Sequence, residues 1–469
     1  MRLLIANRGE IAVRIARTAR EAGHVTVAVH SDADARAAHV LACDEAVSIG
    51  EPMAYLDVPR LVEAAKGCDA IHPGYGFLSE NAGFARAVID AGFRWIGPSP
   101  EAIAAMGDKM GARRRMRAAG VPVVPGVESE DAAEIAALGF PLMVKAAGGG
   151  GGRGLRVVED EAALHDALAE ARAEAGAAFG DARVYAERRI LRPRHVEVQV
   201  LGDTHGNVVH LGERECSIQR RHQKVVEETP STALTPALRE AMCDAAVRAA
   251  KAVDYVGAGT IEFLLDGDRY YFLEMNTRIQ VEHPITEAVR GIDLVRAQLD
   301  VATGGKVPHV PEARGHAIEC RVVAEDPRRD WAPSPGRIAR WRPPSGPGVR
   351  VDAGVVEGSE VPVFYDPLLA KLVVWAEDRP AAIARMLRAL SEFVVLGVDT
   401  NLENLHDVVA SEAFAAGDTH TDFLARFAWQ PPEVDAAAFV AAWKAAPASP
   451  AATSRTTEAS PWSTLGRWP

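Results

Sequence analysis

The first hundred residues alternate between short apolar runs and segments with apolar side chains at helical spacing. Residues 3–6 form an apolar run, residues 11–22 carry apolar side chains three and four positions apart, and residues 25–29 form a β-branched run. Strands that alternate with helices indicate a parallel sheet covered on both faces. Residues 1–107 are therefore predicted to form an N-terminal α/β domain with a parallel sheet.

From about residue 108 to 315 the pattern changes to strands joined by tight turns. One hairpin is predicted at residues 198–210 and another at residues 260–274, each around a segment rich in Gly, Asp and Asn. This pairing indicates an antiparallel, α+β central region. From 316 to 430 further strands precede a helix predicted at residues 379–392, as in a mixed C-terminal domain.

Composition narrows the classes of function. Lys and Arg number 52 against 64 Asp and Glu, a net charge of −12, which argues against a nucleic-acid partner. The five cysteines contain no CxxC pair, which argues against a disulfide framework and a thiolate zinc site.

Neither a signal peptide nor an apolar run of the ~18 residues that a membrane span needs is visible, so we expect a cytoplasmic protein. Residues 431–469, rich in Ala, Pro, Ser and Thr, are predicted to be a linker-like tail.

A run of five glycines follows a predicted strand that ends at Lys145. These glycines, residues 148–152, can fold over a polyphosphate and direct backbone N–H groups at it. Gly149, Gly151 and Gly154 formally satisfy G-x-G-x-x-G, but residues 155–158 indicate a strand where the dinucleotide fingerprint needs a helix. No Gly-Lys-Ser/Thr completes a P-loop. The pattern predicts a mobile hairpin lid with a lysine at its base, and a plain flexible turn is the alternative.

The segment from Glu262 to Glu282 carries the most specific pattern. A hairpin centred on Asp268 makes Glu262 and Glu274 direct cross-strand partners, and two facing carboxylates repel unless a cation lies between them. Such oxygens suit Mg²⁺. Beyond Glu274, polar residues continue in steps of two to Glu282, so an extended chain would place them on one face. The alternative is the solvated face of an edge strand.

Other candidate residues are less specific. A basic cluster at residues 219–224 is more often a solvated surface or a nucleic-acid patch than the wall of an active site, and the net charge of −12 argues against the nucleic-acid patch. His195 and His222 can equally be ordinary hydrogen-bonding histidines. Cys216 has no base nearby in the sequence, so a structural role is expected.

Taken together and in this order, the motifs resemble the biotin carboxylase family of ATP-grasp ligases over about residues 1–430. The matching stretches are Ile5–Ile11, Ile71–Asn81, Met106–Lys109, Lys145–Gly154, Gln219–Glu228, Glu274–Pro284, Glu319–Pro327, Pro333–Gly336 and Tyr365–Asp366. The resemblance implies a Rossmann-like N-terminal domain (1–107), an ATP-grasp domain (108–315) with a lid at about 125–200, and a biotin carboxylase C-terminal domain (316–430).

The resemblance also implies a reaction. ATP and bicarbonate would carboxylate biotin through carboxyphosphate, as the first half-reaction of an acetyl-CoA or acyl-CoA carboxylase. Its implied cofactors are ATP, Mg²⁺ or Mn²⁺, and biotin on a separate biotin carboxyl carrier protein, with a carboxyltransferase subunit as a further partner. The resemblance leaves a homodimer open. No Ala-Met-Lys-Met biotin attachment motif occurs in the chain, and the final acyl acceptor cannot be inferred.

The family's site residues carry over position by position. For ATP the resemblance implies Lys109, Lys145, Gly150, Gly151, Gly152, Glu187, Arg188, Ile190, His195, Gln219, His222, Glu262, Leu264 and Glu274. For the divalent metals it implies Glu262, Glu274 and Asn276. For bicarbonate and biotin it implies Lys224, Arg278, Gln280, Val281, Glu282, Arg321 and Tyr75.

Four of these residues, Lys224, Arg278, Glu282 and Arg321, are implied to be catalytic. Glu282 would be the base that acts on bicarbonate, and Arg321 would stabilise the biotin enolate. Arg188 and Ile190 stand where family members often carry Lys and Leu, which puts only fine nucleotide affinity in question. Two other interpretations stay open: an ATP-grasp ligase that activates a different carboxylate, and a non-catalytic nucleotide-binding scaffold subunit.

Overall fold

The structure is a computed structural model that describes residues 1–129, 131–147 and 154–431. Its N-terminal part is a five-stranded parallel sheet in the order β3-β2-β1-β4-β5. The strands are β1 (Arg2–Ile5), β2 (Val25–Ser31), β3 (Glu45–Gly50), β4 (Ala70–His72) and β5 (Arg94–Trp95). The helical elements around them are α1 (Gly9–Glu21), α2 (Ala38–Ala42), η1 (Pro52–Leu56), α3 (Val58–Ala64) and α4 (Ala82–Asp90).

Alternate residues of β1 explain why its whole run is apolar. Leu3 packs in one buried cluster with Ile15 of α1, whereas Leu4 packs in another with Leu61 of α3 and Phe84 of α4. Both faces of the sheet are therefore covered, as the sequence pattern predicts.

An eight-stranded sheet forms the centre, in the order β14-β13-β10-β11-β12-β15-β22-β20. Every neighbouring pair in it is antiparallel. The strands are β10 (Arg194–Gly202), β11 (Val208–Arg220), β12 (Gln223–Thr229), β13 (Gly257–Asp266), β14 (Arg269–Asn276), β15 (His316–Val323), β20 (Val349–Ala353) and β22 (Leu368–Ala376). Both predicted hairpins are confirmed, with Val200 opposite His210 and Glu262 opposite Glu274.

The large sheet passes through the expected domain boundary at residue 315 without a break. Strand β12 pairs with β15, with Glu227 opposite Glu319. The expected central and C-terminal domains therefore share one sheet.

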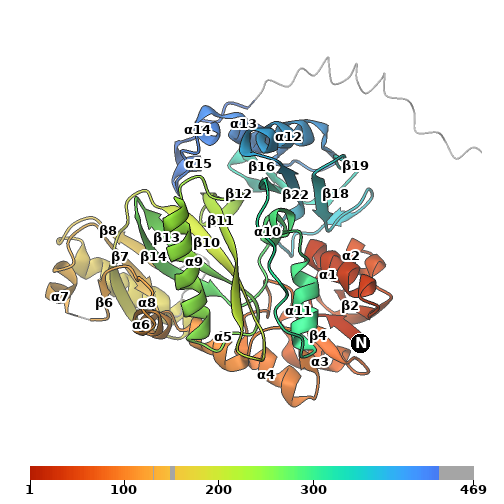
Figure 1. Cartoon of the computed structure of the whole chain (residues 1–469), viewed down its shortest axis with the longest axis horizontal. Coiled ribbons are helices and arrows are strands. Elements are labelled where there is room, and N and C mark those ends of the chain that lie inside the picture. The colour runs from red at the N-terminus through yellow and green to blue at the C-terminus, as the bar shows by residue number, and fades with distance from the viewer. Residues whose placement is uncertain (130, 148–153, 432–469) are drawn as a thin grey trace, which may run out of the picture. The chain divides into compact units, whose positions relative to one another are not determined.

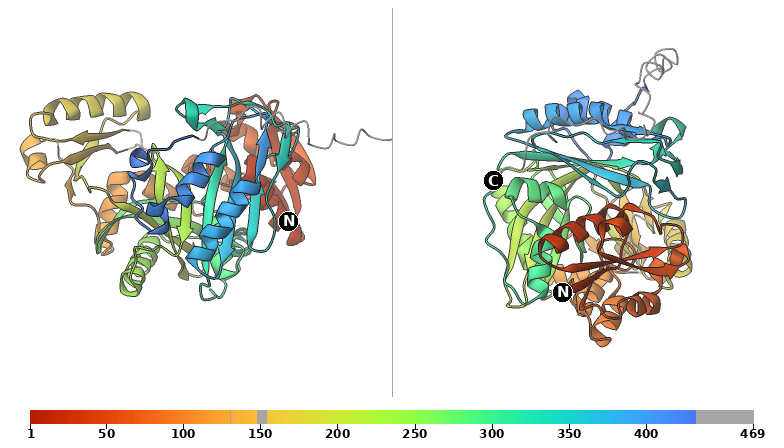
Figure 2. Two further views of the ribbon diagram at one scale, coloured as in Figure 1. Left: turned by 90° about the horizontal axis from the view of Figure 1, so that it is seen from above. Right: turned by 90° about the vertical axis from the view of Figure 1, so that its right-hand side faces the viewer.

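Helices cover this sheet on both sides (Figures 1 and 2). They are α9 (Pro236–Lys251), α10 (His283–Arg290), α11 (Leu294–Ala302), α12 (Arg379–Glu392), α13 (Leu402–Ala410), α14 (Glu412–Ala415) and α15 (Phe423–Arg426). Met242 of α9 packs with Val198 and Ile261, and Met386 of α12 packs with Leu372. Ile285 of α10 packs with Val373, on the face opposite α12. The bounds of α12 match the predicted helix.

A smaller four-stranded sheet, in the order β6-β9-β7-β8, lies at the left of Figure 1. Its strands are β6 (Gly126–Val127), β7 (Leu142–Ala146), β8 (Leu155–Val158) and β9 (Val184–Arg188), with helices α7 (Ala132–Ala136) and α8 (Leu164–Phe179). Helices α5 (Pro100–Gly107) and α6 (Lys109–Ala118) precede it. Strand β8 pairs antiparallel with β7, so the strand predicted after the glycine run is confirmed. The expected lid, at about 125–200, includes the first residues of β10, which pairs with β13 in the large sheet.

Short elements complete the described chain. They are β16 (Glu325–Asp326), η2 (Pro327–Arg329), β17 (Ala332–Pro333), β18 (Gly336–Arg337), β19 (Arg340–Arg342), β21 (Glu360–Val361) and β23 (Val394–Leu396). All five cysteines are free thiols. No helix in the described ranges is both long and apolar enough to span a membrane. The predicted tail lies outside the described residues from 432 onward.

Candidate active site

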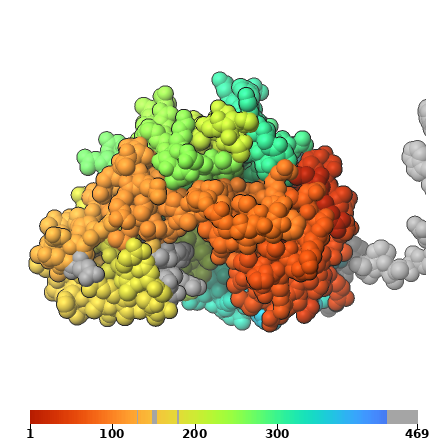
Figure 3. All heavy atoms as spheres, turned by 90° about the horizontal axis from the view of Figure 1, so that it is seen from below, coloured from red at the N-terminus to blue at the C-terminus, as the bar shows by residue number. Residues whose placement is uncertain are grey.

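A cavity of 1890 Å³ lies where the N-terminal sheet, the small sheet and the large sheet meet. Figure 3 shows the surface hollowed between the N-terminal part, in red and orange, and the small sheet, in yellow. Every site residue expected from the resemblance lines this cavity, except Gly150, Gly151 and Gly152, which lie outside the described residues. Side chains from residue 75 to residue 321 are thus brought to one place.

The Lys224 ammonium is the centre of the most connected group in this cavity. It donates to Glu197, to Glu262 Oε1 at 2.8 Å, to Gln280 Oε1 at 3.1 Å and to Glu282 Oε1 at 2.7 Å. Burial alone would lower the pKa of this ammonium, but the three carboxylates raise that pKa well above its usual value. Lys224 therefore stays charged and holds three acidic side chains together.

Glu282 lies between two cations. Its second oxygen, Oε2, accepts from Arg321 Nη2 at 2.9 Å, opposite the contact from Lys224. Burial alone would raise the pKa of Glu282, but Lys224, Arg321 and Arg214 hold it below its ordinary range. The side chain, 1% exposed, is thus an ionised carboxylate inside the protein.

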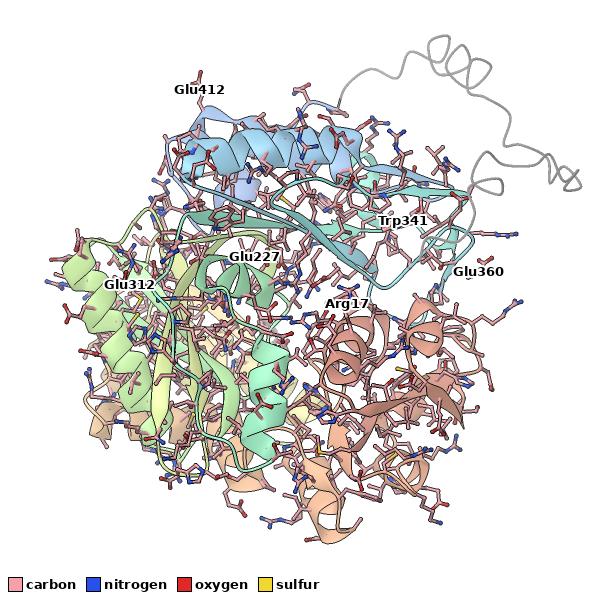
Figure 4. All side chains as sticks on the ribbon, turned by 45° about the vertical axis from the view of Figure 1, so that its right-hand side comes forward. Arg17, Glu227, Glu312, Trp341, Glu360 and Glu412 are labelled. Carbon is pink, nitrogen blue, oxygen red and sulfur yellow. The ribbon has the colours of Figure 1, made fainter. Side chains whose placement is uncertain are left out.

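Arg321 is held from behind by a second carboxyl group. Its Nε donates to Glu227 Oε1 at 2.6 Å, and Glu227 is wholly buried, in the interior of the molecule in Figure 4, whereas Glu360 lies at the surface. Burial raises the pKa of Glu227 to about 7. Its cross-strand partner Glu319 is equally buried, and burial raises the pKa of that carboxyl well above its usual value. Two buried carboxyls directly opposite each other favour the neutral form of at least one of them over two charges.

A row of charged residues crosses four strands of the large sheet. Arg214 on β11 faces Glu197 on β10, which faces Glu262 on β13, which faces Glu274 on β14. Arg214 Nε, with no exposed surface, donates to Glu197 Oε1 at 2.6 Å. The row runs from a buried cation at one end to a half-exposed carboxylate at the other.

Two groups of charged residues lie in the cavity wall or directly behind it. The base cluster consists of Glu197, Arg214, Lys224, Glu227, Glu262, Glu282 and Arg321. The phosphate cluster consists of Lys109, Lys145, Glu187 and Glu274.

The phosphate cluster has fewer contacts. Lys145 Nζ lies 2.5 Å from Glu187 Oε2, and Arg113 Nε lies 3.0 Å from Glu187 Oε1. Lys109 Nζ comes no closer than 3.8 Å to Glu274, whose side chain is 38% exposed. Burial lowers the pKa of Lys109. Two ammonium groups thus face the cavity near one half-exposed carboxylate.

The facing carboxylates of Glu262 and Glu274 fit a hard divalent cation. Burial and the neighbouring Glu262 raise the pKa of Glu274, which is the repulsion that a cation between the two would relieve. Asn276 is differently engaged: its Nδ2 donates to Glu262 Oε1 at 2.8 Å, and its Oδ1 accepts from Arg278 at 2.9 Å. Glu262 is engaged as well, by Lys224 and Gln280, so Glu274 offers the least occupied oxygens of the three residues.

The extended chain predicted from 274 to 282 is wrong beyond Asn276. Strand β14 ends there, and Glu282 stands immediately before helix α10. Glu80, from the N-terminal part, accepts from Thr277 N at 3.0 Å and from Arg278 Nε at 3.0 Å, which fixes the loop. A long-range contact therefore replaces sheet pairing, although the side chains still line one cavity.

The expected nucleotide residues line the side of the cavity next to the phosphate cluster. His195 Nε2 lies 2.9 Å from Glu262 Oε2, and Gln219 lies 3.5 Å from His195 Nδ1. Arg188 and His222 are exposed. The remaining two, Ile190 and Leu264, are partly buried wall residues.

The expected biotin residues lie toward the N-terminal sheet. Tyr75 donates to Glu10, and Glu10 Oε2 lies 3.1 Å from the buried Lys371 ammonium. Lys371 donates to the carbonyl oxygen of Val281 at 2.9 Å, next to Glu282. A chain of polar contacts thus connects Tyr75 with the base cluster.

Sequence reasoning missed several of these residues. The sequence pattern predicts the strands of Glu197 and Arg214 only as the two halves of a hairpin. Glu80 belongs to the N-terminal part of the fold but contacts the loop after β14. The signal for Glu197 and Arg214 is their register opposite Glu262, which appears once the strand order is known. Cys216 is buried and burial raises its pKa, so it is not a reactive thiolate.

Models of known protein families match most of the chain. Residues 1–103 match the biotin carboxylase N-terminal domain, residues 108–310 the ATP-binding domain of carbamoyl-phosphate synthase L chain, and residues 319–426 the biotin carboxylase C-terminal domain. Biotin carboxylase of Nostoc sp. is 51% identical over 438 residues, which cover 90% of this chain and 98% of that one. Biotin carboxylase 1 of Bacillus subtilis is 50% identical over 439 residues, covering 90% of this chain and 98% of that one.

Solved structures agree with the fold. Biotin carboxylase from Campylobacter jejuni, in a β-γ-ATP complex, is 45% identical with a TM-score of 0.88, covering 91% of this chain and 98% of that one. The biotin carboxylase domain dimer of Hydrogenobacter thermophilus 2-oxoglutarate carboxylase, in complex with MgADP, ADP and bicarbonate, is 44% identical with a TM-score of 0.87, covering 90% of this chain and 97% of that one. On this sequence identity and coverage, the chain belongs to the biotin carboxylase family.

Proposed function

We propose that this chain carboxylates biotin on a carrier protein, with ATP as energy source and bicarbonate as carbon source. The observation that carries the proposal is the position of Glu282, a buried carboxylate held between Lys224 and Arg321 at 2.7 and 2.9 Å. The ionised acid and both cations face one cavity that also holds the phosphate cluster. ATP, Mg²⁺ and biotin are the cofactors of this family reaction.

Glu282 is proposed as the base that takes the proton of bicarbonate. Its pKa is low only because cations surround it. When the bicarbonate anion accepts hydrogen bonds from Lys224, those bonds no longer stabilise the Glu282 carboxylate, so its basicity rises as the substrate binds. Deprotonated bicarbonate can then attack the γ-phosphorus of ATP and give carboxyphosphate.

The phosphate cluster is proposed to bind the nucleotide. Lys109 and Lys145 provide ammonium groups for the phosphate oxygens, and Glu262 with Glu274 would hold Mg²⁺, with Asn276 next to them. A bound divalent ion neutralises charge on the transferred phosphoryl group. Gly150, Gly151 and Gly152 remain expected phosphate contacts on the sequence pattern alone. Glu187, Arg188, Ile190, His195, Gln219, His222 and Leu264 are proposed to line the rest of the nucleotide site.

Arg321 is proposed to stabilise the biotin enolate. Deprotonated biotin carries its negative charge on the ureido oxygen, and a planar guanidinium can donate two hydrogen bonds to it. Glu227 holds Arg321 from behind, so one edge of the guanidinium stays directed at the cavity. Arg278, Gln280 and Val281 are proposed to surround bicarbonate, and Tyr75 to border the biotin pocket.

The setting of the reaction is part of the same proposal. Carboxybiotin would be consumed by a carboxyltransferase that moves the carboxyl group to an acyl-CoA. Five free thiols support a reducing compartment such as the cytoplasm.

ATP cleavage by the purified protein tests the function. With Mg²⁺ and bicarbonate we expect slow ATP cleavage that free biotin stimulates. Stimulation by a different carboxylate or an amine, and not by biotin, would favour another ATP-grasp ligase. Nucleotide binding without any cleavage would favour a non-catalytic scaffold.

A further inference from the structure

Four exposed apolar side chains gather at the N-terminal side of the cavity. They are Met53, Phe77, Val363 and Phe364, with exposed fractions of 61%, 39%, 72% and 58%. We call this group the rim patch. Exposed apolar residues scattered singly need no explanation, but a group that includes two aromatic rings does.

Tyr365 connects the three chain segments that carry these four residues. Its ring lies 6.3 Å from that of Phe77 and 6.5 Å from that of Phe364, and its hydroxyl donates to Pro52 O, next to Met53, at 3.3 Å. The Arg8 guanidinium lies 4.1 Å above the same ring. Three segments far apart in the sequence therefore present one surface.

Phe77 has a strained backbone conformation. Its φ is +43°, in the left-handed region that a bulky side chain rarely adopts. Its ring stacks on Tyr55 at 4.9 Å and remains 39% exposed. Strain kept for an exposed aromatic side chain indicates a surface that is used.

The rim patch continues directly into the active site. Phe77, Phe364 and Tyr365 line the cavity, and Phe77 is two residues after Tyr75. Tyr75 contacts Glu10, and Glu10 contacts Lys371, which donates to the carbonyl oxygen of Val281, the neighbour of Glu282 in the base cluster. Whatever brings biotin to Arg321 on a protein-bound arm must stop at the rim of this cavity.

We propose that the rim patch is the docking surface for the biotin carrier domain, which would place an apolar surface around its biotinyl-lysine on these four residues. The proposal rests on the proposed function. Aromatic residues and arginine are the side chains enriched in such interfaces, and Phe77, Phe364, Tyr365 and Arg8 provide them. Free biotin needs no such surface, so the patch should matter only for biotin on its carrier.

The double variant Met53→Ser, Val363→Ser tests this with two substrates, because neither residue lines the cavity. The probe is a purified biotinylated carrier domain from the same organism, compared with free biotin. We expect KM for the carrier to rise about 10- to 30-fold, the usual loss on removing interface anchors. Kinetics with free biotin should stay within about twofold of wild type.

Val25→Ser is the matched control. Val25 is 43% exposed and begins β2, at the opposite end of the parallel sheet from the loops after β1 and β4 that line the cavity. It should leave KM for both substrates unchanged.

Three results would overturn the docking proposal. Unchanged KM for the carrier would show that the patch is not used. An equal loss with free biotin would make it part of the biotin pocket. A change in assembly state of the double variant, measured by sedimentation equilibrium, would make it an interface between two copies of the chain. Absence of any turnover of free biotin by the wild type is a separate result, which contradicts the proposed function itself.

Discussion

The two ends of the cavity are built differently. In the base cluster, three cations and four carboxyl groups hold one another at hydrogen-bond distance, and its Glu282, Glu197 and Arg214 have at most 1% exposed side chain. In the phosphate cluster, Lys109 lies 3.8 Å from a carboxylate that is 38% exposed. The first group is set by the fold throughout, whereas the second is tightly paired at Lys145 and Glu187 and only loosely restrained at Lys109 and Glu274.

Under the proposed function, this difference matches the task of each end. A base and an enolate-stabilising cation act by being held in position before substrate arrives, which requires a rigid, charge-balanced group. Phosphates and their divalent ion bring their own charges, so the residues that receive them need not be balanced in advance. Changes in the base cluster should therefore disturb the whole group, and changes in the phosphate cluster should stay local.

The largest expected effect is on catalysis at the base cluster. Glu282→Gln should reduce bicarbonate-dependent ATP cleavage about 10²- to 10⁴-fold, the range for loss of a general base. ATP affinity, measured by isothermal titration calorimetry, should change little. The control is Glu325→Gln, which lines the same cavity and approaches Arg220 only to 4.0 Å. Near wild-type cleavage by Glu282→Gln would remove it from the mechanism.

Replacing one lysine in each cluster compares how much the two clusters contribute to the free energy of unfolding. Lys224→Met leaves three buried carboxylates without their shared cation, which typically costs about 3–5 kcal/mol of unfolding free energy. Lys109→Met should cost less than about 1 kcal/mol, because its one near ion pair is long and partly exposed. The Lys109→Met variant should instead raise KM for ATP. Urea unfolding of the two variants measures the difference, and equal losses would refute the comparison.

The pH dependence of stability should have opposite signs at the two ends. The folded-state pKa of Glu282 is lowered, so its contribution to stability is present above the ordinary carboxyl pKa and is lost as pH falls through the folded-state value. The pKa of Glu274 is raised, so its ionised form costs free energy that disappears on acidification. Glu274→Gln should therefore stabilise the metal-free protein at pH 7, by about 0.2–1 kcal/mol, and not at pH 4. Urea unfolding at both pH values checks this, and a stabilisation that persists at pH 4 would contradict it.

The smallest expected effect is at the nucleotide wall. Arg188 is exposed, and its backbone N–H, which donates to Pro125 O at 2.9 Å, holds the strand in place whatever side chain it carries. Arg188→Lys should change stability by less than about 0.5 kcal/mol. We expect a correspondingly small change in KM for ATP in steady-state assays. A tenfold change would mean that the side chain, and not the main chain, forms this wall.

The predictable parts of the site are those set by local pairing. The register of Glu262 opposite Glu274 follows from one short hairpin, and it is confirmed. The prediction that the strand continues to Glu282 is wrong. The backbone N–H of Thr277 donates instead to Glu80, nearly two hundred residues earlier in the chain. Periodicity contains no information about such a partner. The roles of Lys224 and Arg321 rest on family resemblance, since a basic cluster alone indicates a surface.

The predictable parts of the fold obey the same rule. The parallel N-terminal sheet and helix α12 follow from periodicity, because each buries one regular face. The joining of β12 to β15 is not predictable from the sequence pattern, since these strands are separated by some ninety residues.

The pairing of β12 with β15 has a mechanical consequence. Lys224 and Arg321 stand on those two adjacent strands, and backbone hydrogen bonds fix the distance between strands. A rotation of one domain against another cannot separate the ammonium from the guanidinium, because both belong to one continuous sheet. If the proposed roles hold, the carboxyl donor and the carboxyl acceptor are received on one continuous sheet, with a fixed separation between the two cations.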